Sequence, residues 1–81
     1  LKHQGQVIYL TTGESRLLKV FAENIGKIIA RDEIVKRLNE VNPRTIDAQI
    51  ARLRTKIEQN PKTPKYLQTI RNEGYILWNV L

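Results

Sequence analysis

The sequence has 81 residues, of which 41% are hydrophobic and 27% are charged, so it predicts one small folded domain rather than a disordered chain. Fourteen lysines and arginines against eight acidic residues give a net charge of +6, which favours a polyanionic partner: DNA, RNA, an anionic membrane or an acidic protein. The absence of cysteine excludes disulfides and thiolate metal sites, and the single histidine, His3, has no neighbouring ligands, so no metal or other cofactor is expected.

The chain is expected to begin with a short strand and then a helix. Residues 6–10 are β-prone and follow Gly5, a turn residue. The motif TTGE at residues 11–14 has the spacing of a capping box, and apolar residues recur after it at helical intervals. These signals predict a helix over about residues 12–25, ended by Gly26 in a left-handed conformation.

A second and a third helix are predicted next. After an apolar link at Ile28-Ile29, which is too short for a sizeable strand, acidic residues open and basic residues close a helix over residues 31–39. Asn42 suits an N-cap and Pro43 the first helical position, so a third helix is expected from there to about Gln59, before Asn60-Pro61.

The last element is expected to be a β-hairpin. Residues 66–71 and 75–78 are β-prone, and the short connection between them, Asn72-Glu73-Gly74, offers glycine for a positive φ. A strand, three helices and a hairpin predict an α+β fold of the winged helix-turn-helix type, in which the short N-terminal strand stands for a reduced sheet and the hairpin is the wing. Three aromatic residues are assigned to its core: Phe21, Tyr66 and Trp78.

The third helix separates into an apolar and a basic side when it is plotted at 100° per residue. The apolar stripe that anchors it to the core consists of Ile46, Ile50, Leu53 and Ile57. The opposite side carries Arg44, Thr45, Ala48, Ala51, Arg52 and Thr55, with Gln49, Arg54 and Lys56 on its flanks. Asp47 points sideways, towards a pairing with Arg44 or Arg54, and only Glu58 near the end places acid on the outer side.

The basic side has the width and chemistry of a surface that enters a major groove. A groove about 12 Å wide admits one helix, arginine can bind guanine in bidentate fashion, and small residues allow the backbone to approach the bases. Arg71 at the hairpin tip suits a narrow minor groove, and Thr69 and Tyr75 beside it suit phosphates. An ordinary solvated helix face is the alternative interpretation of the same charges.

Three segments resemble the OmpR/PhoB-type DNA-binding domains of bacterial response regulators. They are LTTGESRLLKVFAENIGKIIARDEI, RTIDAQIARLRTKIEQNP and PKYLQTIRNEGYIL, which together extend from residue 10 to residue 77. The second resembles the recognition-helix signature of that family, and the third resembles its wing. Ala48-Gln49 and the Asn-Pro after the third helix are more similar to the OmpR branch.

The resemblance implies sequence-specific binding of double-stranded DNA by a two-component transcriptional regulator. Base contacts are then expected from Thr45, Ala48 and Arg52, phosphate contacts from Arg44, Gln49, Arg54, Thr69 and Tyr75, and a minor-groove contact of the wing from Arg71. It also implies a dimer on tandem DNA sites, a location in the bacterial cytoplasm at the nucleoid, and RNA polymerase as a further partner. The loop at residues 39–43 is shorter than in many members, which weakens the expectation for RNA polymerase.

Some features depart from the family pattern. Only about ten residues precede the first helix, where members have a larger antiparallel sheet, and Ala51 stands where many carry a basic residue. No segment resembles the receiver domain, so residues 1–81 are expected to form a single winged-helix DNA-binding domain, with the receiver domain absent from this chain.

Other classes of function remain open at this stage. The first alternative is a protein-interaction winged helix that uses its basic face for an acidic partner, and the second is a general RNA-binding role. An enzyme is the least expected class, because no carboxylate pair or glycine-rich phosphate loop stands out. The apolar runs are too short to span a bilayer and no signal-like start precedes them, so a soluble protein is expected.

Overall fold

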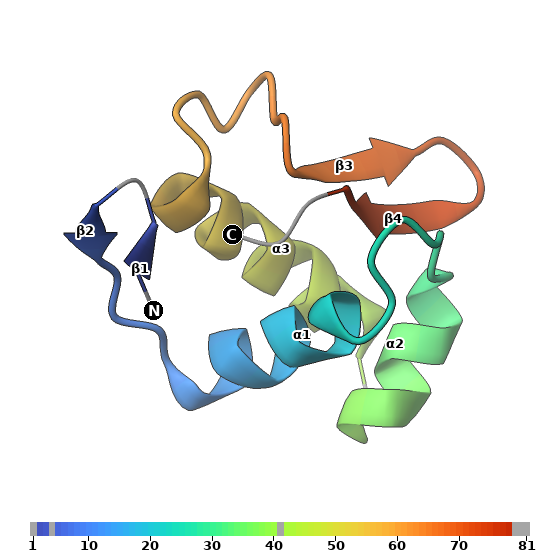
Figure 1. Ribbon diagram of the computed structural model, residues 1–81. Helices are drawn as coiled ribbons and strands as arrows, with labels where there is room; N and C mark the ends of the chain where they lie inside the picture. Colours follow the sequence, from blue (N-terminus) through green and yellow to red (C-terminus); the bar gives the residue numbers. More distant parts are fainter. Residues whose placement is uncertain (1, 4, 41, 79–81) are drawn as a thin grey trace.

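The computed structural model describes residues 2–3, 5–40 and 42–78, and it has the expected α+β order of elements (Figure 1). The elements are β1 (Lys2–His3), β2 (Gln6–Val7), α1 (Thr12–Ala22), α2 (Arg31–Leu38), α3 (Pro43–Ile57), β3 (Leu67–Ile70) and β4 (Gly74–Leu77). None of the helices in the described part is long and apolar enough to cross a membrane. The three helices and the β3–β4 hairpin confirm the predicted winged helix-turn-helix.

Helix α1 begins at the predicted capping box but ends earlier than expected. Thr11 Oγ1 accepts from the Glu14 N–H at 3.1 Å, and Glu14 Oε1 accepts from the Thr11 N–H at 3.0 Å. The predicted end at residue 25 is wrong, because Asn24 Nδ2 caps the Val20 carbonyl at 2.8 Å and the chain then turns. Gly26 has the expected positive φ, 75°, but it lies beyond the helix, where its N–H donates to the Leu77 carbonyl at 2.8 Å.

The other two helices confirm the predicted starts and correct the predicted ends by one or two residues. Helix α2 ends at Leu38 because Asn39 adopts the left-handed conformation, with φ of 53°. At the start of α3, Asn42 Oδ1 accepts from the Arg44 N–H at 3.0 Å and Pro43 occupies the first turn. Helix α3 ends at Ile57, because Glu58 is extended, with φ of −95° and ψ of 140°.

The core lies where α1, α2 and α3 meet the inner face of the wing. The predicted stripe of α3 is fully buried, and the core also includes Leu17, Phe21, Ile29, Ile34, Leu67 and Leu77. Phe21 is therefore core, as predicted, and Tyr66 is partly buried against it. The assignment of Trp78 to the core is wrong: this residue follows β4, is 46% exposed, and donates from Nε1 to Gln68 Oε1 at 2.7 Å.

The N-terminal region contains two very short strands instead of the single strand predicted over residues 6–10. β1 pairs antiparallel with β2, and Gly5, with φ of 79°, lies in the turn between them. The strand ends at Val7, and the Tyr9 carbonyl accepts from Lys56 Nζ of α3 at 3.0 Å. The small sheet thus lies beside the C-terminal end of α3, at the opposite side of the molecule from the wing (Figure 1).

The wing is an antiparallel hairpin held against the link between α1 and α2. β3 and β4 pair from Leu67↔Leu77 to Ile70↔Gly74. Ile29 forms a single bridge with Tyr75, whose N–H donates to the Ile29 carbonyl at 3.0 Å and whose carbonyl accepts from the Ile29 N–H at 2.8 Å. A Cβ on Gly74 would lie 2.1 Å from the Ile29 carbonyl oxygen, so only glycine allows this approach. The hairpin is therefore held against this link close to its turn.

Candidate nucleic-acid interface

One side of α3 presents an open surface, which we call the outer strip: Arg44, Thr45, Ala48, Ala51 and Arg52. All five are exposed except Thr45, which is partly buried. In the described part of the chain, the guanidinium groups of Arg44 and Arg52 have neither an ion pair nor a hydrogen bond, so both are available to a ligand. The buried stripe beneath, from Ile46 to Ile57, fixes the direction in which the strip faces.

Gln49, a predicted phosphate contact, lies between α3 and the first turn of α1. Its Nε2 lies 3.0 Å from the position that a Cβ on Gly13 would occupy. Its Oε1 is buried and has no hydrogen-bond partner within the described residues. The structure thus places this side chain at the edge of the outer strip, and its contact with phosphate stays a prediction.

Arg54 is bound to the wing. Its Nε donates to the Leu67 carbonyl at 2.9 Å, and its Nη2 donates to Thr69 Oγ1 at 2.8 Å. The guanidinium carbon lies 5.8 Å from the centroid of the Tyr75 ring, within cation–π range. Burial lowers the pKa of Arg54 from its usual value. Two of the predicted phosphate contacts, Arg54 and Thr69, are therefore bonded to each other in this structure.

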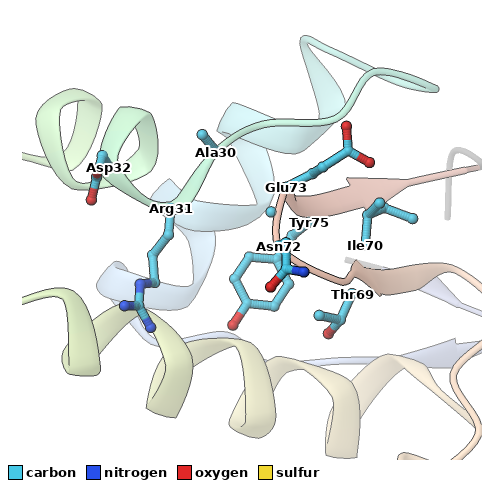
Figure 2. A pocket seen from close by; sticks show the side chains of 9 residues that line it. Ala30, Arg31, Asp32, Thr69, Ile70, Asn72, Glu73 and Tyr75 are labelled. Atoms are coloured by element: carbon cyan, nitrogen blue, oxygen red, sulfur yellow. The ribbon is translucent and has the colours of Figure 1, made fainter.

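Asp47 pairs with neither of the partners expected from the sequence. Its Oδ2 accepts from Arg31 Nη1 at 2.7 Å, and its Oδ1 accepts from the Tyr75 hydroxyl at 2.6 Å. The expected pairing with Arg44 or Arg54 is wrong because Asp47 faces the start of α2 and the wing instead. Figure 2 shows Arg31 and Tyr75 both reaching towards the α3 ribbon, from α2 and β4 respectively.

Tyr75 keeps its proton over the physiological pH range. Burial, followed by the hydrogen bond to Asp47, raises the pKa of Tyr75 to about 12. The phenol is therefore a permanent donor to the carboxylate. We call the four residues that join α3 to the wing the wing clamp: Asp47, Arg54, Thr69 and Tyr75.

Two charged residues at the end of α3, one in its last turn and one just beyond it, have roles that the sequence interpretation missed. Lys56 Nζ donates to Glu14 Oε1, and Glu14 is only 3% exposed. Glu58 does not lie on the outer side, as expected, but is 7% exposed. Its carboxylate accepts hydrogen bonds from three successive backbone N–H groups, those of Lys65, Tyr66 and Leu67. No local sequence pattern links Glu58 to that segment; only the position directly after buried Ile57 could have suggested an inward direction.

The tip of the wing is exposed and consists of Arg71, Asn72 and Glu73. Arg71 is where the sequence predicted it, and Asn72 adopts a positive φ of 65° in the turn. An open hollow separates this tip from the start of α2, and Arg31, Asp32, Thr69 and Tyr75 are among its lining residues (Figure 2). The arginines of the outer strip and of the tip have no partner among the described residues, and the wing clamp joins the helix that carries the first surface to the hairpin that carries the second.

Comparison with known proteins places this geometry in a family. The family model described as transcriptional regulatory protein, C terminal, matches residues 5–77. Protein PetR of Rhodobacter capsulatus is 38% identical over 86 residues, which cover 95% of this chain and 36% of PetR. The chain spans about a third of the length of the curated relatives it matches.

Two solved structures share the fold. The response regulator DrrB of Thermotoga maritima, described as an OmpR/PhoB homologue, has a TM-score of 0.87 and 35% identity over 94% of this chain and 36% of its own. The DNA-binding domain of RstA of Klebsiella pneumoniae, in complex with the RstA box, has a TM-score of 0.84 and 32% identity. That alignment covers 94% of this chain and 80% of the RstA chain.

Proposed function

The chain belongs to the family of C-terminal domains of transcriptional regulatory proteins, of the OmpR/PhoB type, and on that premise we propose that it binds specific sequences of double-stranded DNA. Helix α3 enters the major groove, and the β3–β4 wing lies at the adjacent minor groove. The observation that carries this proposal is the outer strip, where two arginines without partners among the described residues flank alanines on a helix whose opposite side is fully buried.

The outer strip has the groups needed to read bases. Arg52 is the last residue of the strip and can donate in bidentate fashion to the O6 and N7 of guanine, while Thr45 and Ala48 offer small surfaces to neighbouring bases. Arg44, at the start of the helix, contacts phosphate, and Arg71 at the wing tip enters the minor groove. The net charge of +6 supports attraction to the duplex.

The other residues predicted to contact phosphate also form contacts within the protein. Arg54, Thr69 and Tyr75 belong to the wing clamp, and Gln49 packs against α1. We propose that these residues reach phosphates only with atoms that their internal contacts leave unused. Their first effect on binding is then to hold the two DNA-contacting surfaces in place.

The proposal extends to the biological setting. The domain acts in the bacterial cytoplasm, at the nucleoid, as the effector part of a two-component regulator, and it binds tandem sites as a dimer. Relatives about three times longer support the view that a controlling part accompanies such a domain. Contact with RNA polymerase through the loop at residues 39–43 is the weakest part of the proposal, because that loop is short.

Selection of bound duplexes from a random pool, followed by sequencing, tests the proposal. We expect enrichment of a defined sequence, and direct repeats spaced about one helical turn apart if the domain binds as a tandem dimer. Binding that shows no sequence preference and disappears at physiological salt would contradict the proposal, and it would favour an acidic protein as the partner.

A further inference from the structure

The position of Asp47 is unexpected for a surface that binds DNA. Asp47 directly precedes Ala48 of the outer strip, and its side chain is 38% exposed. A negative charge so close to the phosphates weakens attraction to the duplex. We therefore expect an acid at this position to make a contribution to binding that outweighs this loss of attraction.

The structure gives Asp47 two partners, one on each neighbouring element. One carboxylate oxygen accepts from Arg31, the first residue of α2, and the other accepts from the hydroxyl of Tyr75 in β4. Both bonds are short, as expected when the acceptor is ionised, at 2.7 and 2.6 Å. One side chain thus joins α2, α3 and the wing at a single point.

Asp47 and Arg54 hold the two strands of the wing separately. They lie about two helical turns apart on α3, so both face the wing. Asp47 binds Tyr75 in β4, and Arg54 binds Leu67 and Thr69 in β3. Thr69 and Tyr75 are directly paired across the hairpin, so the two attachments meet at one step of the ladder.

We propose that Asp47 is a positioning residue for DNA binding, which fixes the wing to α3 through Tyr75. The inference rests on the proposed function and deepens it, because it assigns a role to a residue that touches neither bases nor phosphates. With the wing fixed, Arg71 stays at a set distance from Arg52, and both grooves are engaged without a cost for ordering the wing. Without the Asp47 bond, the wing keeps its backbone bridge to Ile29 and its bonds to Arg54 but loses the attachment of β4 to α3, so its orientation is less strictly fixed and part of that cost returns.

The direction in which Asp47→Ala changes the affinity for the duplex separates this positioning role from a purely electrostatic effect. Asp47→Ala removes a negative charge from the binding surface, so Coulomb attraction alone predicts tighter binding. The positioning role predicts the opposite, a duplex affinity lower by about tenfold, the size expected when a hydrogen bond to a charged group is lost. The measurement is a fluorescence anisotropy titration of the full 81-residue chain with a duplex obtained by selection.

Two further variants serve as controls. Asp32→Ala removes an equal charge from the neighbouring helix, where Asp32 is exposed and has no partner in the described part of the structure, so a small gain in affinity is expected. Tyr75→Phe removes the same hydrogen bond without a change in charge, and it keeps the result decisive if Asp47→Ala unfolds. The Tyr75→Phe change is expected to cost affinity in the wild-type chain but little in a chain that already carries Asp47→Leu, because leucine is of similar size and has no acceptor for the hydroxyl.

A double-mutant cycle shows whether Asp47 acts through the wing. Arg71→Ala should weaken binding clearly in the wild-type chain and by much less in the Asp47→Ala chain, because Arg71 is no longer held in place. Equal costs in both chains, or an Asp47→Ala chain that binds as tightly as the wild type or tighter, would overturn the inference and leave the proposed function intact. A wild-type chain without any duplex binding would overturn both.

Discussion

Two sides of α3 use their charged residues in different ways. On the outer strip, Arg44 and Arg52 extend without partners in the described structure. On the sides that pack against the rest of the domain, Arg54 is bonded to the wing and Lys56 to Glu14, and just beyond the helix Glu58 is bonded to the segment before β3. The same helix thus presents a ligand surface on one side and fastens the domain together on its other sides.

This difference arises from what lies beside each side of the helix. The β3–β4 wing and the segment that leads to it pass along the last turns of α3, and the N-terminal strands lie near its C-terminal end (Figure 1). Backbone carbonyls and N–H groups there need partners, and the charged side chains supply them. On the outer strip, Arg44 and Arg52 are exposed and have no partner among the described residues, so they remain free for a polyanion.

The largest effect that tests this comparison is expected at Glu58. Glu58→Ala leaves three backbone N–H groups near the start of β3 without their acceptor, which should lower the free energy of unfolding by about 3 kcal/mol. Urea denaturation measures the change. The neighbouring exposed residue provides the control, since Gln59→Ala should have almost no effect; a loss of similar size at both positions would show that the carboxylate is not the cause.

A second effect on stability is expected at Glu14 and depends on pH. The Lys56 ammonium lowers the pKa of the Glu14 carboxyl from its usual value, so the folded state favours the charged form. Glu14→Gln should therefore lower the free energy of unfolding at pH 7, by about 2 kcal/mol. Because the folded pKa is depressed, the contribution exists above the unfolded pKa of about 4.3 and disappears as the pH falls through the folded value.

The pH dependence gives the measurement for Glu14. Urea midpoints of the wild-type and Glu14→Gln chains should differ at pH 7 and converge at acidic pH. Glu23→Ala is the control at an exposed position after α1, and its urea midpoint should stay close to that of the wild type at both pH values. A difference between the wild-type and Glu14→Gln chains that is as large in acid as at pH 7 would mean that the ion pair with Lys56 is not its source.

On the outer strip of α3, the expected effect of a substitution falls on binding and not on stability. Arg52→Ala should reduce the discrimination between the selected duplex and a scrambled duplex by about 1–3 kcal/mol, because a bidentate base contact is lost. Its free energy of unfolding should change by less than about 0.5 kcal/mol, since the side chain is exposed and without partners in the described structure. Unchanged discrimination would remove Arg52 from the set of base contacts.

Local signals allowed most of the fold to be predicted from the sequence. The capping box at Thr11, the Asn42-Pro43 start and the turn before Gly74 depend on residues close in the chain, and all three are present in the structure. The buried stripe of α3 follows from helical periodicity alone. The small N-terminal sheet was only partly predicted, because its strands are two residues each and leave no periodic pattern.

The polar contacts of the site were much harder to predict. A helical plot shows the direction of a side chain but not the element that lies there. Asp47 and Arg54 find their partners in α2 and in the wing, far away in sequence, and Glu58 turns inward at a helix end where the plot no longer applies. Arg44 and Arg52 have no partner among the described residues, so the helical plot alone was enough to predict that their side chains are exposed on the outer strip.

The salt dependence of duplex binding tests the division of α3 most directly. We expect Arg44→Ala to flatten the plot of log affinity against log salt by about one unit of slope, because a phosphate contact is lost. Arg54→Ala should weaken binding but flatten the slope much less than Arg44→Ala does, because most of the donors of its guanidinium are bonded to the wing. An equal flattening by both substitutions would show that Arg54 also acts mainly on phosphate, and it would contradict the division proposed for the helix.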